Sequence, residues 1–178
     1  MADRIRVDVL APAEQWIQAI EQLSQLVTKT VTTAVKATNR IYGAIEVCVV
    51  LSDDKELCLL NKEHRGINSP TNVLSFPSDP IPDYEEESYK IGGRPLVLGD
   101  IVIAYETMLR ESEEMSKSLA DHLAHILIHG VLHLCQFDHN KDDEAKIMEG
   151  MEISILRELG VTNPYSSIPY TDNSVDES

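Results

Sequence analysis

Residues 129–139 read His-Gly-Val-Leu-His-Leu-Cys-Gln-Phe-Asp-His, with histidines at positions 129, 133 and 139. Residues four apart lie on one face of a helix, so His129 and His133 can present ring nitrogens to one metal ion. The apolar helical pattern fades after Leu134, which leaves room for a bend that returns His139 to the same ion. Three imidazoles leave one position of a tetrahedral zinc open, as in catalytic zinc sites. The run therefore predicts one zinc per chain, held by His129, His133 and His139.

The other polar residues near this run have simpler interpretations. Ordinary helix histidines with hydrogen-bond partners are the alternative to a metal site, but three unpaired imidazoles in an apolar segment are costly to bury. His125 precedes His129 by four residues, yet a straight helix carries it too far along its axis to share an ion with His133. His122 lies on the same predicted helix, and we expect a structural or surface role for His125. Cys135 should point away from the cluster and is not expected to be a ligand.

Length and cysteine usage predict one domain in a reducing compartment. A chain of 178 residues is long enough for a single hydrophobic core. Its three cysteines are odd in number and show no Cys-x-x-Cys spacing, which argues against a disulfide framework. The sequence shows no secretory leader pattern and no apolar run long enough to cross a bilayer. We therefore expect a cytoplasmic protein with no membrane partner.

The formal net charge of −15 restricts the choice of partners. A strongly acidic chain repels nucleic acid at long range, so RNA binding would need a local basic site or a partner that supplies positive charge. Much of the acidity is peripheral, in the loop around residues 79–87 and in the tail around residues 172–177. We interpret these charges as solvated groups that maintain solubility.

Hydrophobic periodicity predicts an α+β fold in a single domain. Strands are expected at residues 4–10, 44–51, 71–76 and 98–104, and helices at 12–38, 55–64, 105 to 110 or beyond, 119–134 and 142–159. Residues 77–95 should form a long loop. We expect a small mixed sheet of about four strands packed with about five helices, with the metal site on a central helix. Residues 1–162 would form this domain, and residues 163–178 an acidic, disordered tail.

The histidine spacing is that of the metzincin peptidases, His-Glu-x-x-His-x-x-Gly-x-x-His. Two positions differ, because Gly130 replaces the catalytic Glu and Gln136 replaces the Gly at the turn. Without that Glu the site lacks the general base that activates water for peptide hydrolysis. A residual metallopeptidase is therefore the least favoured hypothesis.

With Gly130 in place, residues 129–139 resemble the YbeY family of bacterial rRNA maturation factors and zinc endoribonucleases, whose pattern is His-Gly-x-Leu-His-Leu-x-Gly-Tyr-Asp-His. Further blocks resemble the family in the same order. They are Leu60-Asn61 to Arg65, Thr71-Asn72-Val73-Leu74-Ser75-Phe76-Pro77, Leu98-Gly99-Asp100-Ile101, and the acidic residues Asp143, Glu144, Glu149 and Glu152 of the last helix. The resemblance covers the chain from about Leu51 to Gly160.

Three positions depart from the family pattern. Gln136 stands where the family has Gly, so the turn into His139 must avoid a left-handed backbone or tolerate strain. Phe137 replaces Tyr and lacks one hydroxyl. Asn72 replaces Asp, which would weaken the support of a ligand histidine or an arginine if the family carboxylate provides it. No departure affects a ligand.

The resemblance implies a role for Arg65, which matches a family arginine near the metal that is implicated in RNA processing. A guanidinium can bind phosphate oxygens and stabilise the charge that builds during phosphodiester cleavage. From the residues alone, Arg65 is equally well a surface charge at a helix end. We count Arg65 and His129 as the catalytic residues. Asp100 and Asp138 are weaker candidates that either orient a ligand imidazole or act as turn residues.

The leading hypothesis, implied by the resemblance, is a zinc-dependent, single-strand-specific endoribonuclease. It would act on ribosomal RNA in small-subunit maturation and in ribosome quality control. The alternative is a non-catalytic assembly factor in which a structural zinc holds the fold and an acidic surface binds ribosomal proteins. The oligomeric state, the general base and the cleavage site do not follow from the sequence.

Overall fold

The computed structural model describes residues 4–81, 89–90 and 94–166. Its main sheet has four strands, in the spatial order β1 (Arg4–Leu10), β3 (Ala44–Ser52), β6 (Leu96–Ala104) and β4 (Val73–Pro77). The first three strands run parallel, and β4 pairs antiparallel with β6 and forms one edge. The predicted small mixed sheet in an α+β domain is therefore confirmed.

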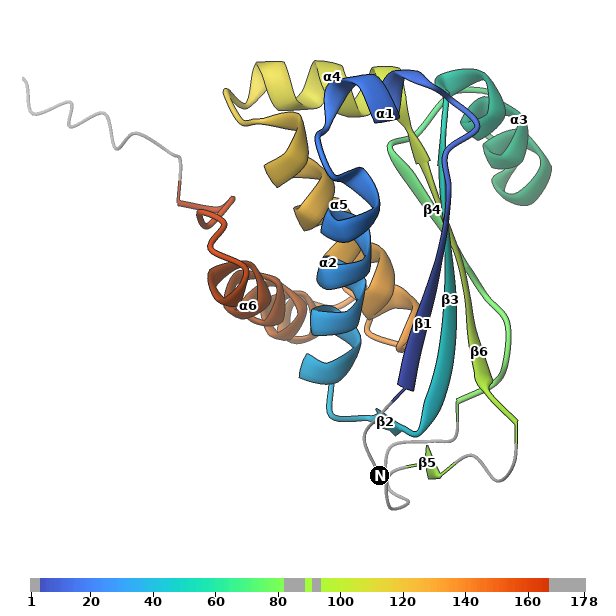
Figure 1. The fold of residues 1–178 in the computed structure, drawn as a ribbon, viewed down its shortest axis with the longest axis vertical. Helices are drawn as coiled ribbons and strands as arrows, with labels where there is room; N and C mark the ends of the chain where they lie inside the picture. The colour runs from blue at the N-terminus through green and yellow to red at the C-terminus, as the bar shows by residue number, and fades with distance from the viewer. Residues whose placement is uncertain (1–3, 82–88, 91–93, 167–178) are drawn as a thin grey trace, which may run out of the picture.

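Helices cover the two faces of the sheet unequally (Figure 1). One face is covered by α2 (Leu23–Ala37), α5 (Leu119–Leu134) and α6 (Asp142–Glu158), which share the larger hydrophobic core with the sheet. The other face carries α3 (Asp54–Arg65), whose Leu57 packs against Leu74 and Val102 in a smaller cluster. The metal-site sequence thus lies on the helix that is most enclosed by other elements.

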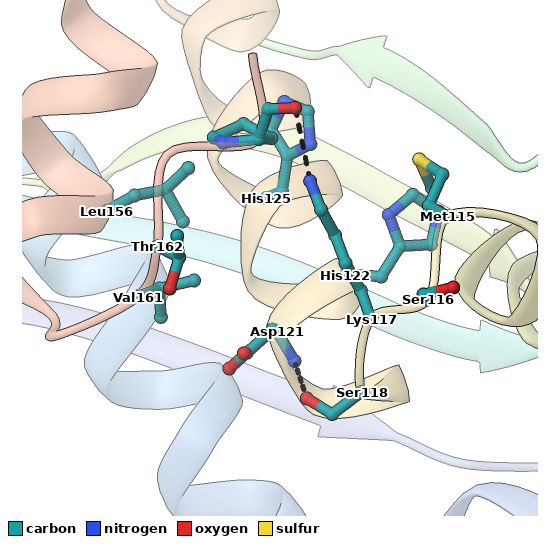
Figure 2. Close-up of a pocket in the computed structure, with 11 residues that line it drawn as sticks. Met115, Ser116, Lys117, Ser118, Asp121, His122, His125, Leu156, Val161 and Thr162 are labelled. Atoms are coloured by element: carbon teal, nitrogen blue, oxygen red, sulfur yellow. Dashed lines mark hydrogen bonds between the residues drawn. The ribbon is translucent and has the colours of Figure 1, made fainter. Parts of the chain in front are cut away.

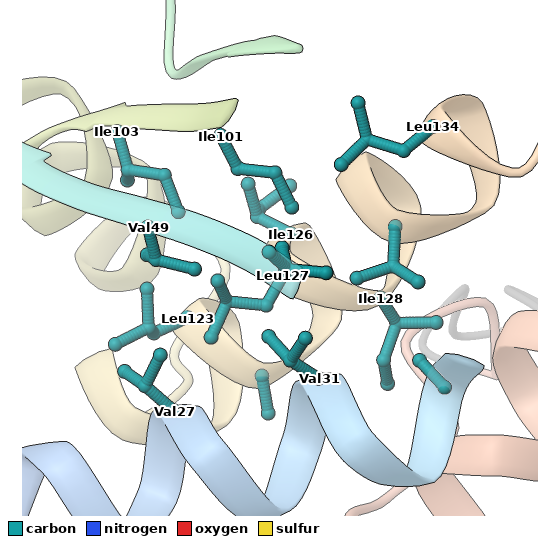
Figure 3. Packing of buried hydrophobic residues seen from close by; sticks show 14 of the residues in the cluster. Val27, Val31, Val49, Ile101, Ile103, Leu123, Ile126, Leu127, Ile128 and Leu134 are labelled. Carbon is teal, nitrogen blue, oxygen red and sulfur yellow. The ribbon is translucent and has the colours of Figure 1, made fainter. Parts of the chain in front are cut away.

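The helix α5 lies between α2 and the sheet, as Figure 3 shows. Leu123 and Leu127 of α5 are fully buried, with Val27 of α2 on one side and Val49 of β3 on the other. Burial of such side chains contributes about 1.5–3 kcal/mol each. This packing fixes the rotation of α5, and so fixes which of its residues face the open edge of the sheet at β4.

The single long helix expected at residues 12–38 is wrong. The structure has two helices, α1 (Gln15–Ala19) and α2, separated by a break at which Gln22 adopts a left-handed φ of 53°. The break lets Trp16 turn over the end of β3, where its indole Nε1 donates to the carbonyl of Ser52 at 2.9 Å. A continuous helix would not place both Trp16 and the α2 stripe against the sheet.

The remaining elements differ from the prediction mainly at their ends. β6 begins at Leu96, two residues early, whereas α4 (Tyr105–Glu114) agrees with the helix expected from residue 105 to 110 or beyond. A two-stranded pair, β2 (Ile41–Tyr42) with β5 (Tyr89–Lys90), was not expected. Much of the predicted 77–95 loop and most of the predicted disordered tail, from residue 167, lie outside the described residues. In the described part, no helix has the length and apolar content needed to cross a bilayer.

Candidate metal centre

The three predicted histidines come together at the C-terminal end of α5. His129 and His133 lie one turn apart on the same face of the helix, and His139 follows after a turn. One ring nitrogen of each residue lies within 4.8 Å of the other two. His129 and His133 are half-buried and His139 is exposed, so the group has one open side.

A tight turn after α5 returns the chain to this group. The N–H of Phe137 donates to the carbonyl of Leu132 at 2.9 Å, and Gln136 adopts a left-handed φ of 65°. This is the hydrogen bond of a Schellman motif, in which glycine is the usual residue at the left-handed position. Of the two outcomes expected for a Gln at this position, the structure has the left-handed backbone. The side chain of Gln136 donates to the carbonyl of Ile81.

The hydrogen bonds of two histidines determine which nitrogens are free. Nδ1 of His129 lies 2.7 Å from Oε1 of Glu152, and Nδ1 of His133 lies 3.1 Å from the carbonyl oxygen of Phe137. Both oxygens are acceptors, so both Nδ1 atoms donate. The two Nε2 atoms then carry lone pairs, and they face each other at 3.0 Å.

Two facing lone pairs repel each other unless a cation lies with them. Zinc ligands of this type characteristically donate their second nitrogen to a carboxylate or a carbonyl, which is the pattern at His129 and His133. Burial lowers the pKa of His133, and the neighbouring His129 and His139 lower it further. A neutral imidazole is the form that binds metal. The donor set therefore fits a divalent cation with imidazole ligands.

Glu152 of α6 holds one of the three histidines, a contact that the sequence spacing did not predict. Its side chain is 1% exposed on α6 and accepts hydrogen bonds from His125, His129 and Tyr165. Burial alone would raise its pKa, but these three bonds outweigh burial and lower the pKa to about 2. Glu152 falls in the buried stripe of α6, four residues after Met148. A charged residue in such a stripe needs partners, and this position could have indicated its role.

His122, His125 and Cys135 lie outside the group. His122 is buried and its Nε2 lies 2.7 Å from Glu111 of α4. His125 contacts Glu152 rather than the three-histidine group. Cys135 is fully buried, burial raises its pKa to about 12, and its sulfur is not among the ligand atoms of the group.

The group opens into a cleft of about 450 Å³ beside the edge strand β4. None of the described residues that line this cleft is Asp or Glu. They are Arg65, Thr71, Asn72, Val73, Ser75, Pro77, His129, His133 and His139. In a chain with a net charge of −15, the described lining of this cleft is a local exception, because it has no carboxylate that would repel an anionic ligand.

Arg65 lines the cleft from the C-terminal end of α3. The left-handed Gly66 ends the helix there, and the Arg65 side chain is exposed. Its guanidinium makes no hydrogen bond or ion pair with the residues that the structure describes. The fold therefore brings Arg65 and the three histidines to one cleft, with the Arg65 donors unused.

The two aspartates considered as supports do not contact a ligand imidazole. Asp138 accepts from the backbone N–H of His139 and from the side chain of Asn140, which makes it a turn residue. Asp100 is exposed on β6 and pairs with Phe76 across the strands. Asn72 donates to Glu111 at 3.1 Å, and so does not hold Arg65 or a ligand histidine.

A family model described as Endoribonuclease YbeY matches residues 11–160. The chain belongs to the YbeY family. Relatives named Endoribonuclease YbeY match over most of their length. The one from Rhodopseudomonas palustris (strain BisB5) is 43% identical over 159 residues, which is 89% of this chain and 80% of that relative. The one from Bradyrhizobium diazoefficiens is 42% identical over 164 residues, which is 92% of this chain and 87% of that relative.

The YbeY fold assignment also agrees with a solved structure. The solution structure of TM1509 from Thermotoga maritima matches with a TM-score of 0.52 at 22% identity. The match covers 93% of this chain and 98% of that protein. At this identity the likeness supports the fold alone.

Proposed function

We propose that the chain is a zinc-dependent, single-strand-specific endoribonuclease that acts in the maturation of small-subunit ribosomal RNA and in ribosome quality control. His129, His133 and His139 would bind the zinc, and Arg65 would bind the scissile phosphate. The partners would be ribosomal RNA and proteins of the small ribosomal subunit, in the cytoplasm. The observation that carries the proposal is the three-histidine group in a cleft that also contains Arg65 and whose described lining residues include no Asp or Glu.

The hydrogen-bond arrangement supports metal binding at this group. Glu152 and the Phe137 carbonyl fix the tautomers of His129 and His133, so that both Nε2 atoms are free. Imidazole nitrogen donors suit zinc, although nickel and copper bind such sets too. When bound, zinc supplies a Lewis acid that polarises a phosphoryl oxygen and lowers the pKa of water.

The cleft supports a phosphodiester substrate. The guanidinium of Arg65 has donors in a planar fork that matches two phosphate oxygens, and no carboxylate in the described lining competes for it. As negative charge grows on the phosphoryl oxygens, this contact strengthens. RNA is proposed as the substrate because the relatives are named as endoribonucleases.

The structure argues against the peptidase alternative at one position. Gly130 takes the place of the metzincin Glu, and a Cβ built there would already lie 3.1 Å from Ile101. A Glu side chain at this point would therefore have to displace the side chains of Ile101 and Ser75. Among the described lining residues, the histidines are the groups that titrate near neutral pH, and in His129 and His133 one ring nitrogen already donates to its support while the other would bind the metal.

The test combines metal content with RNA cleavage in four proteins. Wild type should contain one zinc and cleave a single-stranded ribosomal RNA fragment. His133→Ala should lose both metal and cleavage, and Arg65→Ala should keep the metal but lose at least about 100-fold in cleavage rate, the size expected for removal of one transition-state contact. Lys62→Ala, an exposed cation on the same helix that does not line the cleft, is the matched control and should retain both.

Two results would oppose the proposal. If His133→Ala lost its metal without any change in cleavage, the nuclease assignment would be wrong and an assembly factor with a structural zinc would remain. If Arg65→Ala and Lys62→Ala lowered cleavage equally, Arg65 would contribute only general positive charge. Circular dichroism of each variant checks that the fold is retained.

A further inference from the structure

The last described residues, 161–166, pack back against α5 and α6 instead of leaving the domain. They lie after the family model's match, which ends at residue 160. The N–H of Val161 donates to the carbonyl of Leu156 at 2.8 Å, and the N–H of Tyr165 donates to the side chain of Asn163 at 2.8 Å. We call residues 161–166 the C-terminal segment. These bonds give it a fixed path towards α5.

Polar contacts attach this segment across an open space. A cavity of about 240 Å³ separates part of it from the start of α5, lined among others by His122, His125 and Val161. Figure 2 shows Lys117 reaching across this cavity, where its Nζ donates to the carbonyl of Pro164 at 3.2 Å. Apolar packing is incomplete at this cavity. The attachment of the C-terminal segment therefore depends on the bond from Lys117 to Pro164 and on the contacts of Tyr165, the residue after Pro164.

Tyr165, the residue after Pro164, reaches the buried carboxylate of Glu152. Its hydroxyl donates to Oε2 of Glu152 and lies 3.4 Å from Nε2 of His125. The Tyr165 ring meets the His125 ring edge to face, with the ring centres 5.6 Å apart. The segment therefore places one hydroxyl on a carboxylate that is otherwise enclosed by α5 and α6.

The two oxygens of Glu152 have separate partners. Oε1 accepts from Nδ1 of His129, whereas Oε2 accepts from His125 and Tyr165. A carboxylate held at Oε2 cannot rotate away from His129 at Oε1. The orientation of the His129 ring thus depends on contacts made at the far oxygen, by residues that do not touch the proposed metal.

We propose that Tyr165 is a positioning residue for the metal centre, acting through Glu152 on His129. The C-terminal segment would then contribute to metal retention, although it lies outside the part of the chain that the family model matches. This inference rests on the proposed metal site. Partners of this kind typically change metal affinity by 10–100-fold when they contact the ligand directly, and Tyr165 is one bond further out.

The test measures zinc affinity by chelator competition on the full chain. Tyr165→Phe removes only the hydroxyl and should weaken zinc binding by about 3- to 10-fold. Tyr42→Phe is the matched control, because its hydroxyl donates to the carbonyl of Asn39 and the residue does not line the cleft. It should bind zinc within about twofold of wild type. The absorption spectrum of the cobalt-loaded protein should change in Tyr165→Phe and not in Tyr42→Phe.

A double-variant cycle tests whether Tyr165 acts through Glu152. Glu152→Gln should weaken zinc binding more than Tyr165→Phe, and adding Tyr165→Phe to Glu152→Gln should have no further effect. An equal additional loss in the double variant would overturn the proposed route. Zinc affinity of Tyr165→Phe equal to that of Tyr42→Phe would overturn the role of Tyr165. If wild type itself bound no zinc, the proposed metal centre would fail first, and this result is distinct from the other two.

Discussion

Gly130 lies directly against Ile101, so that a Cβ atom on Gly130 would be 3.1 Å from Cγ2 and 3.2 Å from Cδ1 of that side chain. Ile101 is fully buried on β6 and cannot move towards solvent. This contact lets the ligand-bearing turn of α5 approach the sheet closely. A larger side chain at position 130 would therefore have to displace Ile101.

We predict opposite effects for two helical Gly→Ala substitutions. At Gly150 of α6, a new Cβ meets nothing within 4 Å, so Gly150→Ala should raise the unfolding free energy by about 0.5–1 kcal/mol through helix propensity. Gly130→Ala gains the same propensity but overpacks the core, which costs about 1–3 kcal/mol. Its net effect should be a loss of about 1 kcal/mol. Urea unfolding of both variants measures the difference, and equal effects would mean that Ile101 moves aside freely.

The buried Glu152 predicts a specific acid sensitivity. Its pKa is about 2 in the folded protein against 4.5 in its unperturbed state, so the folded form binds fewer protons between these values. The stabilisation is therefore complete above about pH 4.5 and is lost as the pH falls towards 2, with an upper size of about 3 kcal/mol. In metal-free protein, the stability difference between wild type and Glu152→Gln should shrink steadily below about pH 4.5. A difference independent of pH would assign the loss to packing instead.

Asn72→Asp restores the family residue but should destabilise this chain. The Asn72 amide donates to Glu111 at 3.1 Å, and a carboxylate there would face a second carboxylate. Repulsion should raise the pKa of the pair in the folded state, so the penalty appears as the pH rises through that value. We expect a loss of about 1–2 kcal/mol near neutral pH that decreases in mild acid. Asn72→Ala, which lacks the charge, should show no such pH dependence in thermal unfolding at matched pH values.

Cys135 should resist alkylation in the folded protein. Burial raises its pKa to about 12, and its side chain is fully enclosed, so both thiolate and access are lacking. Iodoacetamide at mildly basic pH should modify Cys58, which is partly exposed, and leave Cys135 unmodified until denaturant is added. Peptide mass spectrometry reads each site. A large increase in Cys135 labelling on metal removal would show that the bound ion keeps the turn around Cys135 closed.

The parts of the site that sequence predicted are those set by local spacing. His129 and His133 meet because four residues make one helical turn, and the change of composition after Leu134 predicted the bend that returns His139. Glu152 could not be assigned in the same way. It lies 23 residues after His129 on another helix, and its contact depends on how α6 packs against α5.

The fold shows the same division. The strands and α5 follow from their own apolar patterns. The break at Gln22 instead accompanies a contact between residues far apart in sequence, the hydrogen bond from Trp16 to the carbonyl of Ser52. Periodicity runs through the break unchanged, so the apolar stripe alone predicted one helix. Likewise, the partner of Asn72 is Glu111, 39 residues later, and no local pattern indicates that pairing.

The turn after α5 positions two of the three histidines, so one local opening would be enough to release a bound cation. The carbonyl of Leu132 accepts from the N–H of Phe137, and the carbonyl of Phe137 accepts from Nδ1 of His133. The same turn brings His139 back to the group. Fraying of this helix end would therefore disturb two of the three imidazoles at once. An ion held here would leave at the rate of local opening instead of by stepwise loss of single ligands, and its presence would in turn slow amide hydrogen exchange in the turn.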